Sequence, residues 1–378
     1  MRKAIVVLPT YNEAGNIEKA ITQIFDIDKI VENWQLEILV VDSNSPDNTA
    51  DIVKKLQKNN KQLHLLETPK EGLGKAYVRG FTHATEKLQA YAIFEMDADG
   101  QHDPKEIPNF LKQIEKGADF VIGSRYIRGG SIPSEWGLDR KIFSVLGNLI
   151  VRFGFMKLKI TDWTDGYRCI KTWVVKKALH HVTPYSGYVF QIALLDYAVK
   201  NNAVIQEIPV QFRERNAGES KISSGRYIFD ILFYIFKESS FIKFVIVGLI
   251  GFVVDFGFAS LFIFLHINKV ASNMMSAELA IISNFLLNNT WSFKHKKIVG
   301  GTFAYVLNFL KFNFLSLGSI LIQGVGMFLT LRFLGDYVLN IMGIHIGTWI
   351  VYKVLIILLV IIPYSYILYN KFIWKDKK

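Results

Sequence analysis

The sequence contains a single cysteine, Cys169, among its 378 residues. A single cysteine excludes a disulfide bond within the chain and is typical of a protein in a reducing compartment. The ordinary role of such a residue is that of a small, buried, apolar side chain. The chain also lacks an apolar leader behind its first residues, Met1-Arg2-Lys3, so we expect no signal peptide.

Acidic residues are fewer than basic ones, 33 against 44, which gives a formal net charge of +11. Such an excess could indicate a nucleic-acid partner. Much of it, however, lies beside long apolar segments, which favours an anionic membrane surface and no nucleic acid. Charged residues populate the first 240 positions, whereas apolar runs fill the rest. Because the chain is also too long for one ordinary domain, we expect a soluble domain followed by a membrane domain.

Two carboxylates follow the apolar segment 91–94, which is typical of a buried strand. Asp97 and Asp99 stand one residue apart, and Gln101 follows them. In an open α/β sheet, ligands bind at the carboxyl ends of the strands. Two carboxylates and an amide suit a hard divalent cation such as Mg²⁺ or Mn²⁺, which also binds substrate phosphates. The alternative is a solvated acidic turn, because this pair alone is a weak signal.

Short β-branched runs alternate with helical patterns through the first 235 residues. The predicted strands are residues 4–8, 37–41, 63–67, 91–94, 120–122 and 204–212. Strands that alternate with helices at this spacing indicate an α/β protein with a Rossmann-like, mostly parallel sheet. The segment 161–168 between them is predicted to be a polar turn.

Several loops after these strands carry residues that could bind a nucleotide. Tyr11 could stack on a base and Glu13 could accept a hydrogen bond, although Glu13 is equally typical of a first helical turn. Arg125 stands among glycines at a strand end and could grip a phosphate. Asp165 is either a general base or a turn former. The basic segment 213–221 could close over a diphosphate or be an ordinary linker.

Two helical segments could lie on a bilayer surface. The first, about 136–156, has an apolar stripe with Arg140, Lys141 and Arg152 beside it. The second, about 224–240, is rich in aromatic residues. Both patterns are typical of interfacial helices, although the first could equally pack on the sheet.

Several ordered motifs together are more specific than any one of them. They are Leu8-Pro9-Thr10-Tyr11-Asn12-Glu13, Gly72-Leu73-Gly74-Lys75-Ala76-Tyr77, Met96-Asp97-Ala98-Asp99-Gly100-Gln101-His102, Gly123-Ser124-Arg125-Tyr126 and Gly218-Glu219-Ser220-Lys221. In this order they resemble the family 2 glycosyltransferases of GT-A fold, and most closely the dolichol phosphate mannose synthases. The resemblance covers residues 1–235 and implies an enzyme that uses a nucleotide sugar.

The resemblance implies a role for each matching position. The metal and the donor diphosphate would be held by Asp97, Asp99 and Gln101. The nucleoside would be held by Pro9, Tyr11, Glu13 and Asp42. The acceptor lipid phosphate would be held by Arg125, Arg140 and Ser144. The donor diphosphate and leaving group would be covered by Arg213, Arg215 and Lys221. Catalysis would depend most on Asp99, Arg125 and Arg215.

The sequence departs from the family pattern in two places. Ser43 stands where many relatives carry a second aspartate after Asp42, which weakens that nucleoside contact. The turn Thr164-Asp165-Gly166-Tyr167 differs from the commoner Thr-Ser-Gly-Phe, so no catalytic role is assigned to Asp165.

Four apolar runs in the second part approach the roughly 20 residues that span a hydrocarbon core. They are residues 244–265, 270–287, 312–331 and 346–369. Lysines gather in the loop after the second run and in the C-terminal tail, whereas the opposite side has only Lys269 and Arg332. The positive-inside rule therefore predicts a cytoplasmic catalytic domain and two cytoplasmic termini.

Three charged residues interrupt these runs: Asp255, Glu278 and Lys353. Charges are costly in lipid, so we expect them to face the interior of the bundle, toward each other. Residues 241–378, with the run 284–293, resemble the GtrA-like membrane family. We expect this domain to anchor the enzyme and present its acceptor rather than to transport.

The resemblance implies transfer of mannose from GDP-mannose to dolichyl (polyprenyl) phosphate at the cytoplasmic membrane face. The reaction would be metal-dependent and inverting. One alternative is a polyprenyl-phosphate glucosyltransferase that uses UDP-glucose, although Gln101-His102 fits the mannose branch better. The other is a non-enzymatic protein that binds or flips lipid. The intact pair Asp97 and Asp99 argues against this second alternative.

Overall fold

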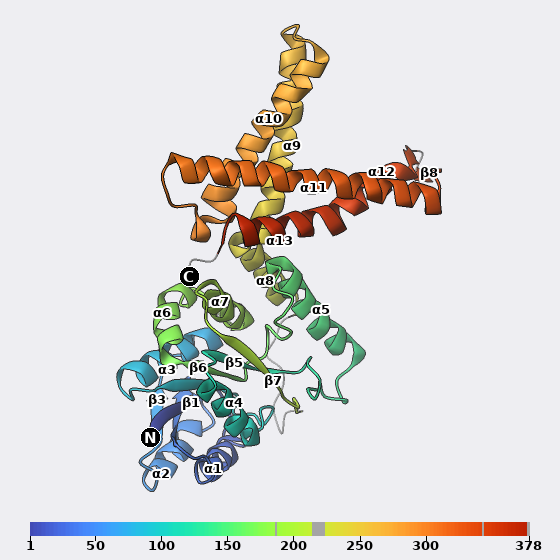
Figure 1. Ribbon diagram of the computed structural model, residues 1–378. Coiled ribbons are helices and arrows are strands. Elements are labelled where there is room, and N and C mark those ends of the chain that lie inside the picture. The colour runs from blue at the N-terminus through green and yellow to red at the C-terminus, as the bar shows by residue number, and fades with distance from the viewer. Residues whose placement is uncertain (186, 214–223, 342–343, 376–378) are drawn as a thin grey trace. The chain divides into compact units, whose positions relative to one another are not determined.

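The computed structural model describes residues 1–185, 187–213, 224–341 and 344–375 (Figure 1). The chain divides into two compact units, Met1–Ile235 and Phe236–Lys378. The first unit holds the predicted α/β sheet, and the second holds the apolar helices.

A seven-stranded sheet in the order β3-β2-β1-β4-β6-β5-β7 forms the centre of the first unit. Its strands are β1 (Arg2–Thr10), β2 (Trp34–Asp42), β3 (Leu63–Glu67), β4 (Ala92–Glu95), β5 (Phe120–Ser124), β6 (Arg168–Lys171) and β7 (Ile205–Pro209). All neighbouring pairs are parallel except those of β6, which is antiparallel to β4 and to β5. The mostly parallel α/β sheet predicted from the sequence is therefore confirmed.

Strand β6 is the element that the sequence pattern missed. Arg168 was expected at the end of a polar turn, but it begins this central strand and is fully buried. A run of four residues with a basic residue at each end shows neither apolar continuity nor alternation. Its partners are distant in sequence, and the burial of Cys169 between β4 and β5 confirms the expected role of that cysteine.

Helices cover both faces of the sheet, as the periodicity of the sequence requires. They are α1 (Ile17–Asp28), α2 (Thr49–Gln57), α3 (Leu73–Glu86), η1 (Pro104–Glu106), α4 (Ile107–Glu115), α5 (Leu138–Phe155), α6 (Thr172–Val182), α7 (Gly187–Lys200) and α8 (Ser224–Glu238). Helices α1, α2 and α4 pack on one face of the sheet, against alternate strand residues such as Val6 and Val40. Helix α3 packs on the other face, where a Cβ on Gly80 would lie 2.7 Å from Val7 Cγ1.

Among its described residues, the second unit contains four helices long and apolar enough to cross a membrane: Ser240–Phe264, Lys269–Ser292, Thr302–Leu334 and Thr348–Phe372. They comprise α9 (Ser240–Phe264), α10 (Lys269–Leu287) with η2 (Asn288–Ser292), α11 (Thr302–Leu334), and α12 (Thr348–Ile356), η4 (Ile357–Ile361) and α13 (Ile362–Phe372). A short helix, η3 (Lys294–Lys296), and a hairpin of β8 (Val338–Ile341) and β9 (Ile344–Gly347) lie between them. The four predicted apolar segments are therefore helices.

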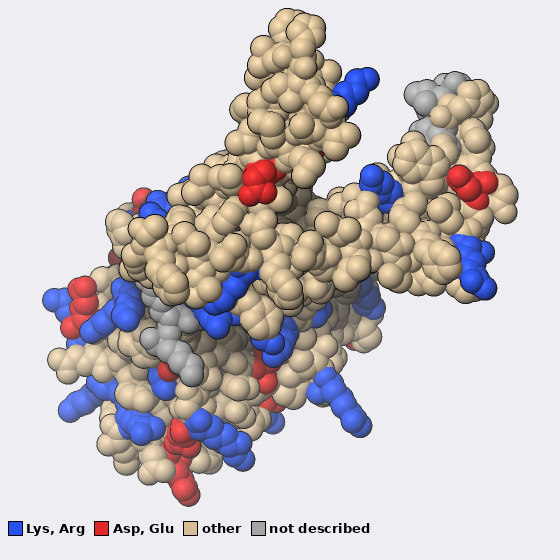
Figure 2. All heavy atoms as spheres, turned by 45° about the horizontal axis from the view of Figure 1, so that its top comes forward, with Lys and Arg blue, Asp and Glu red and all other residues tan. Residues whose placement is uncertain are grey.

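The three charged residues in these helices were expected to contact one another, but they do not. Asp255 accepts a hydrogen bond from Ser276 Oγ at 2.6 Å, whereas Glu278 and Lys353 are exposed. For Glu278 the reason is helical geometry. Ser276 lies on the buried face of α10, and a residue two positions later points about 200° away. Figure 2 shows that charges are dense on the first unit and sparse over these apolar helices.

The close approach of α3 to the sheet gives a test of the packing. Gly80→Ala places a Cβ within 2.9 Å of side-chain atoms of both Val7 and Val41, and β-branched side chains have little rotamer freedom to move aside. We expect this change to lower the free energy of unfolding by about 1–3 kcal/mol. Gly147→Ala is the matched control, because a Cβ on this helical glycine meets nothing within 4 Å. Thermal unfolding of the full chain in detergent should separate the two, and equal melting temperatures would contradict the packing.

Candidate active site

A cavity of about 600 Å³ lies in the first unit, at the carboxyl edge of the parallel strands. Loops that follow β1, β2, β3, β4 and β5 supply much of its wall. The predicted site residues that line it are Pro9, Tyr11, Glu13, Asp97, Asp99, Gln101, Arg125 and Arg140. The fold therefore brings residues more than a hundred positions apart to one space.

The acidic motif after β4 is held in a tight, ordered turn. Gly100 has a φ of 86°, a conformation that favours glycine. Asp99 Oδ1 accepts from the main-chain N–H of Gln101 at 3.0 Å. The amide nitrogen of Gln101 donates to the carbonyl of Arg213 at 3.3 Å, so its oxygen is the atom suited to a metal. Asp97, Asp99 and Gln101 are thus an oxygen donor set of the kind that a hard divalent cation requires.

A buried carboxyl group and a buried guanidinium lie next to this motif. Glu95 and Arg168 are both fully buried, with Glu95 Oε2 3.7 Å from Arg168 Nε. Burial, which outweighs the opposing effect of Arg168, raises the pKa of Glu95 to about 8. Arg168 also donates to the carbonyl oxygens of Trp163 at 2.9 Å, and of Asp165 and Gln191 at 2.7 Å each. One guanidinium therefore holds two segments that contribute to the cavity wall, the turn at Asp165 and helix α7.

His102 connects the acidic motif to the turn that contains Asp165. Its ring is buried and stacks on Tyr167, with the ring centroids 4.9 Å apart. Nδ1 accepts from the main-chain N–H of Asp97 at 3.0 Å, so the neutral ring carries its proton on Nε2, 3.4 Å from Asp165 Oδ1. Burial lowers the pKa of His102, but Asp165 and Asp97 outweigh it and the net shift is upward.

Arg125 is fixed by Asp162 rather than extended into open space. Its Nε and Nη2 donate to the two carboxylate oxygens of Asp162 at 2.7 and 2.8 Å, and Nη2 also donates to Thr164 Oγ1 at 2.9 Å. Among the described residues, Nη1 has no hydrogen bond, and this corner can bind an anion in the cavity. Burial raises the pKa of Asp162, but Arg125 outweighs it and the net shift is downward.

Arg140 lines the cavity beside Arg125 and lies over the Trp136 ring, 3.7 Å from its centroid. This stacking holds the guanidinium plane against the indole ring. Lys70 lies over the ring of Tyr11 in the same way, with its Nζ 3.6 Å from the centroid. Neither pair was identified from the sequence. Tyr11 and Lys70 come from loops that only the fold brings together, whereas Trp136 and Arg140 are local neighbours at the start of α5.

Some predicted residues lie elsewhere. Asp42 does not line the cavity, because its carboxylate accepts from Thr10 Oγ1 at 2.8 Å and from Ser45. Ser144 shares a hydrogen bond of 2.6 Å with the Tyr126 hydroxyl and also lies outside the wall. Arg213 is half-exposed and contacts Asp103. Arg215 and Lys221 lie outside the described residues.

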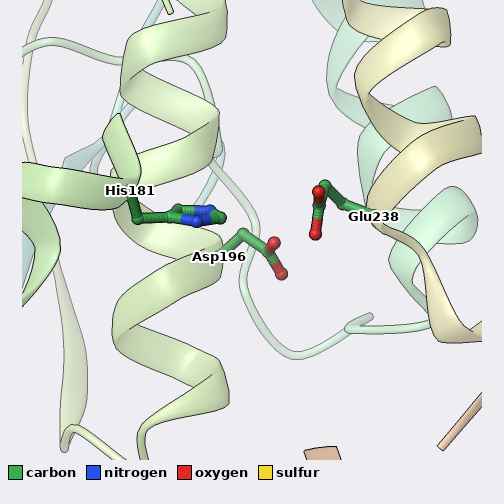
Figure 3. A group of neighbouring side chains, drawn as sticks. All are labelled: His181, Asp196 and Glu238. Carbon is green, nitrogen blue, oxygen red and sulfur yellow. The ribbon is translucent and has the colours of Figure 1, made fainter. Parts of the chain in front are cut away.

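A second group of titratable side chains lies away from the cavity (Figure 3). The His181 ring of α6 and the Asp196 carboxylate of α7 point into the same space. Asp196 already forms an ion pair with Lys200 at 2.7 Å and accepts from the Tyr234 hydroxyl at 3.0 Å. Because its charge is balanced, we assign it no metal. Glu238, also drawn there, belongs to the second unit and is not counted with them.

The comparisons with known proteins agree with this arrangement. Residues 5–182 match the family described as "Glycosyl transferase family 2", and residues 243–374 match "GtrA/DPMS, transmembrane domain". The sheet, its cavity and these two matches define a class of protein, a glycosyltransferase of GT-A fold attached to a membrane domain. The protein is thus an enzyme and a membrane protein.

Two similar proteins indicate which family within this class the chain belongs to. A dolichol-phosphate mannosyltransferase from Pyrococcus furiosus is 32% identical over 363 residues, which cover 93% of this chain and 97% of that protein. A polyprenol monophosphomannose synthase from Mycolicibacterium smegmatis is 35% identical over 226 residues, 59% of this chain and 82% of that protein. The chain therefore belongs to the family of the dolichol-phosphate mannosyltransferases.

One further relative and one solved structure are also similar to the chain. An undecaprenyl-phosphate mannosyltransferase from Micrococcus luteus is 35% identical over 224 residues, which cover 59% of this chain and 88% of that protein. Among solved structures, glucosyl-3-phosphoglycerate synthase from Mycobacterium tuberculosis, in complex with Mn²⁺, UDP and glucosyl-3-phosphoglycerate, aligns with a TM-score of 0.45 at 18% identity. That alignment covers 62% of this chain and 80% of the other.

The buried pair of Arg125 and Asp162 gives a test of the site. Asp162→Asn leaves a buried guanidinium without its counter-charge, and we expect the free energy of unfolding to fall by about 3–5 kcal/mol. Thermal unfolding of the full chain in detergent measures the loss. Because the pKa of Asp162 is lowered by folding, the stabilisation is complete above the pKa of an unfolded aspartate, about 3.9. It is lost as the pH falls through the folded value.

A matched control is Asp26→Asn, which breaks an exposed pair with Lys29. Surface pairs contribute little, so its melting temperature should equal that of the wild type. If both variants unfolded at the same temperature, the pair would not fix Arg125.

Proposed function

We propose that the protein transfers one mannose from GDP-mannose to dolichyl (polyprenyl) phosphate at the cytoplasmic face of a membrane. The observation that carries the proposal is the cavity itself. Three oxygen ligands suited to a metal and a diphosphate line the same space as two arginines suited to a second phosphate. The relatives support the choice of sugar and lipid, since their names combine mannose with dolichol, polyprenol or undecaprenyl phosphate.

The donor occupies the part of the cavity lined by the loops after β1 and β4. Pro9, Tyr11 and Glu13 hold the nucleoside, and Asp42 acts indirectly by holding the loop beside Ser43. Asp97, Asp99 and Gln101 would hold Mg²⁺ or Mn²⁺. When bound, such an ion supplies the positive charge that stabilises a departing diphosphate.

The acceptor phosphate binds at Arg125 and Arg140. A phosphate monoester has its second pKa near 6 and is mostly a dianion at neutral pH. It therefore needs no protein base to attack. Its oxygen forms a bond to the anomeric carbon while the bond from that carbon to the diphosphate breaks. Direct displacement of this kind converts an α-linked donor into a β-linked product.

The chain's own cations orient both phosphates for this step. Arg125 keeps its fixed position through Asp162, and Arg140 through Trp136. Positioning two reactants in one geometry lowers the barrier without new chemistry. We also propose that Arg213, Arg215 and Lys221 cover the leaving group, and that Ser144 contributes to the acceptor site through Tyr126.

Two helices would place this cavity at a lipid surface. Helix α5 exposes large apolar side chains, among them Ile142, Phe143 and Phe153, and α8 exposes Phe229 and Phe233. One residue separates the end of helix α8 at Glu238 from the start of the apolar helix α9 at Ser240. We propose that segments 136–156 and 224–240 lie at the interface, that residues 241–378 form the GtrA-like anchor, and that both termini are cytoplasmic.

The function is tested by transfer of radiolabelled sugar from GDP-mannose and from UDP-glucose to a short-chain dolichyl phosphate. We expect mannolipid from GDP-mannose only, formed by the full chain in detergent with Mn²⁺. Formation of glucolipid from UDP-glucose would mean that the donor is UDP-glucose, and it would leave the proposed mechanism unchanged. Absence of a lipid product from either donor would contradict the proposal and favour a role in lipid binding.

The metal assignment gives a second test. Asp99→Ala removes one carboxylate of the donor set, and we expect transfer to fall about 100-fold or more. Removal of divalent ions by a chelator should have a similar effect on the wild type. The exposed Asp26→Ala variant serves as control and should keep full activity. Undiminished turnover by Asp99→Ala in the presence of Mn²⁺ would exclude this role.

The acceptor assignment is tested with adjacent basic residues of α5. Arg140→Ala should raise the KM for dolichyl phosphate about tenfold or more while the KM for the donor stays constant, because a charged hydrogen bond is lost. Lys141→Ala is the matched control, since Lys141 lies outside the cavity wall and donates to the Ser134 carbonyl. A rise in the donor KM alone would mean that the two phosphate sites are exchanged.

A further inference from the structure

The turn at Asp165 lies between the two ends of the cavity. On one side, Thr164 Oγ1 accepts from Arg125 Nη2 at 2.9 Å. On the other side, Asp165 Oδ1 lies 3.4 Å from Nε2 of His102, which follows Gln101 directly. A group that is passed from a diphosphate at the acidic motif to a phosphate at Arg125 must therefore lie against this turn.

Two acceptor oxygens in this part of the wall lack a hydrogen bond among the described residues. They are Oδ2 of Asp165 and Oε1 of Gln191. The side chains are 1% and 2% exposed, and both residues line the cavity. Buried acceptors are nearly always paired, because an unmade hydrogen bond is costly. These two oxygens are therefore suited to a ligand that donates hydrogen bonds.

The main chain at both positions is fixed, whereas the ends of the side chains can turn. Arg168 donates to the carbonyls of Asp165 and Gln191 at 2.7 Å each. A Cβ on Gly166 would lie 3.6 Å from both Gln191 Nε2 and His102 Cε1, so these residues border one glycine. The terminal torsions of aspartate and glutamine are soft. A small rotation is thus enough to turn each oxygen toward a ligand.

We propose that Asp165 and Gln191 form a subsite that accepts hydrogen bonds from hydroxyl groups of the transferred hexose. The inference rests on the proposed function, because it places the sugar between the donor diphosphate and the acceptor phosphate. A hexose offers neighbouring hydroxyl groups, each of which can donate to one of the two oxygens. Asp165 is a binding residue in this role rather than a base, since the acceptor phosphate is already ionised.

This subsite would select the sugar by its hydroxyl groups. A site that hydrogen-bonds a hydroxyl discriminates strongly against an analogue without it, because the acceptor is then left unpaired. The carboxylate should contribute more than the amide, because hydrogen bonds to charged groups are the stronger ones.

The test uses the full chain in detergent with GDP-mannose and its 2-, 3-, 4- and 6-deoxy analogues, beside UDP-glucose. Asp165→Asn keeps the shape of the side chain, and we expect it to lower kcat/KM for GDP-mannose about 10- to 100-fold. With one deoxy analogue, the kcat/KM of the wild type should fall by a similar factor. With that analogue, Asp165→Asn should lower kcat/KM little further. Gln191→Leu should behave in the same way toward one analogue, with a smaller factor.

Asp119→Asn is the control variant. Asp119 forms an ion pair with Lys171 at 3.0 Å at the amino end of β5, away from the cavity, and this variant should keep wild-type kinetics. An equal loss with GDP-mannose and with every deoxy analogue would mean that Asp165 only supports the fold, and would overturn the inference alone. A wild type that transfers no sugar from any donor would overturn the proposed function and the inference together.

Discussion

The buried guanidinium of Arg168 is the constraint on which the site depends. Its Nε lies 3.7 Å from Glu95 Oε2 next to the acidic motif, and the guanidinium donates to the carbonyl oxygens of Trp163, Asp165 and Gln191. A buried charge is costly in free energy unless it is paired and hydrogen-bonded. Separation of the segments that surround Arg168 would break its hydrogen bonds and is therefore unfavourable. Strand β6, which is antiparallel to both of its neighbours in the seven-stranded sheet, places this residue there, between two strands that end at the cavity.

A second buried pair, Arg125 and Asp162, fixes a cation at another part of the cavity. Each arginine of the cavity is fixed by a partner, Arg125 by a carboxylate and Arg140 by the face of Trp136. A catalyst of phosphoryl or glycosyl chemistry gains most from charges that do not move during the reaction. The site is therefore arranged in advance of substrate binding.

The sequence predicted those parts that depend on local pattern. Apolar runs gave the parallel strands and the four long helices, and the spacing of Asp97, Asp99 and Gln101 identified the acidic motif. It could not predict contacts between distant segments. Arg168 shows no strand pattern of its own, and Asp42 satisfies a strand-end pattern although Thr10 and Ser45 occupy its oxygens. The prediction that Glu278 contacts the other charged residues was wrong, because the face of the helix on which a residue lies, rather than its depth along the helix, decides which residues meet.

The central claim is that donor and acceptor meet in one cavity, with the hexose between their phosphates. The stereochemistry of the product tests it most directly. Lipid-linked sugar formed from α-linked GDP-mannose can be examined by NMR, through the one-bond carbon–hydrogen coupling constant of the anomeric centre. A β-linked product is predicted by direct attack of the acceptor phosphate. An α-linked product would require a covalent intermediate or attack from the leaving-group side, and would contradict the account.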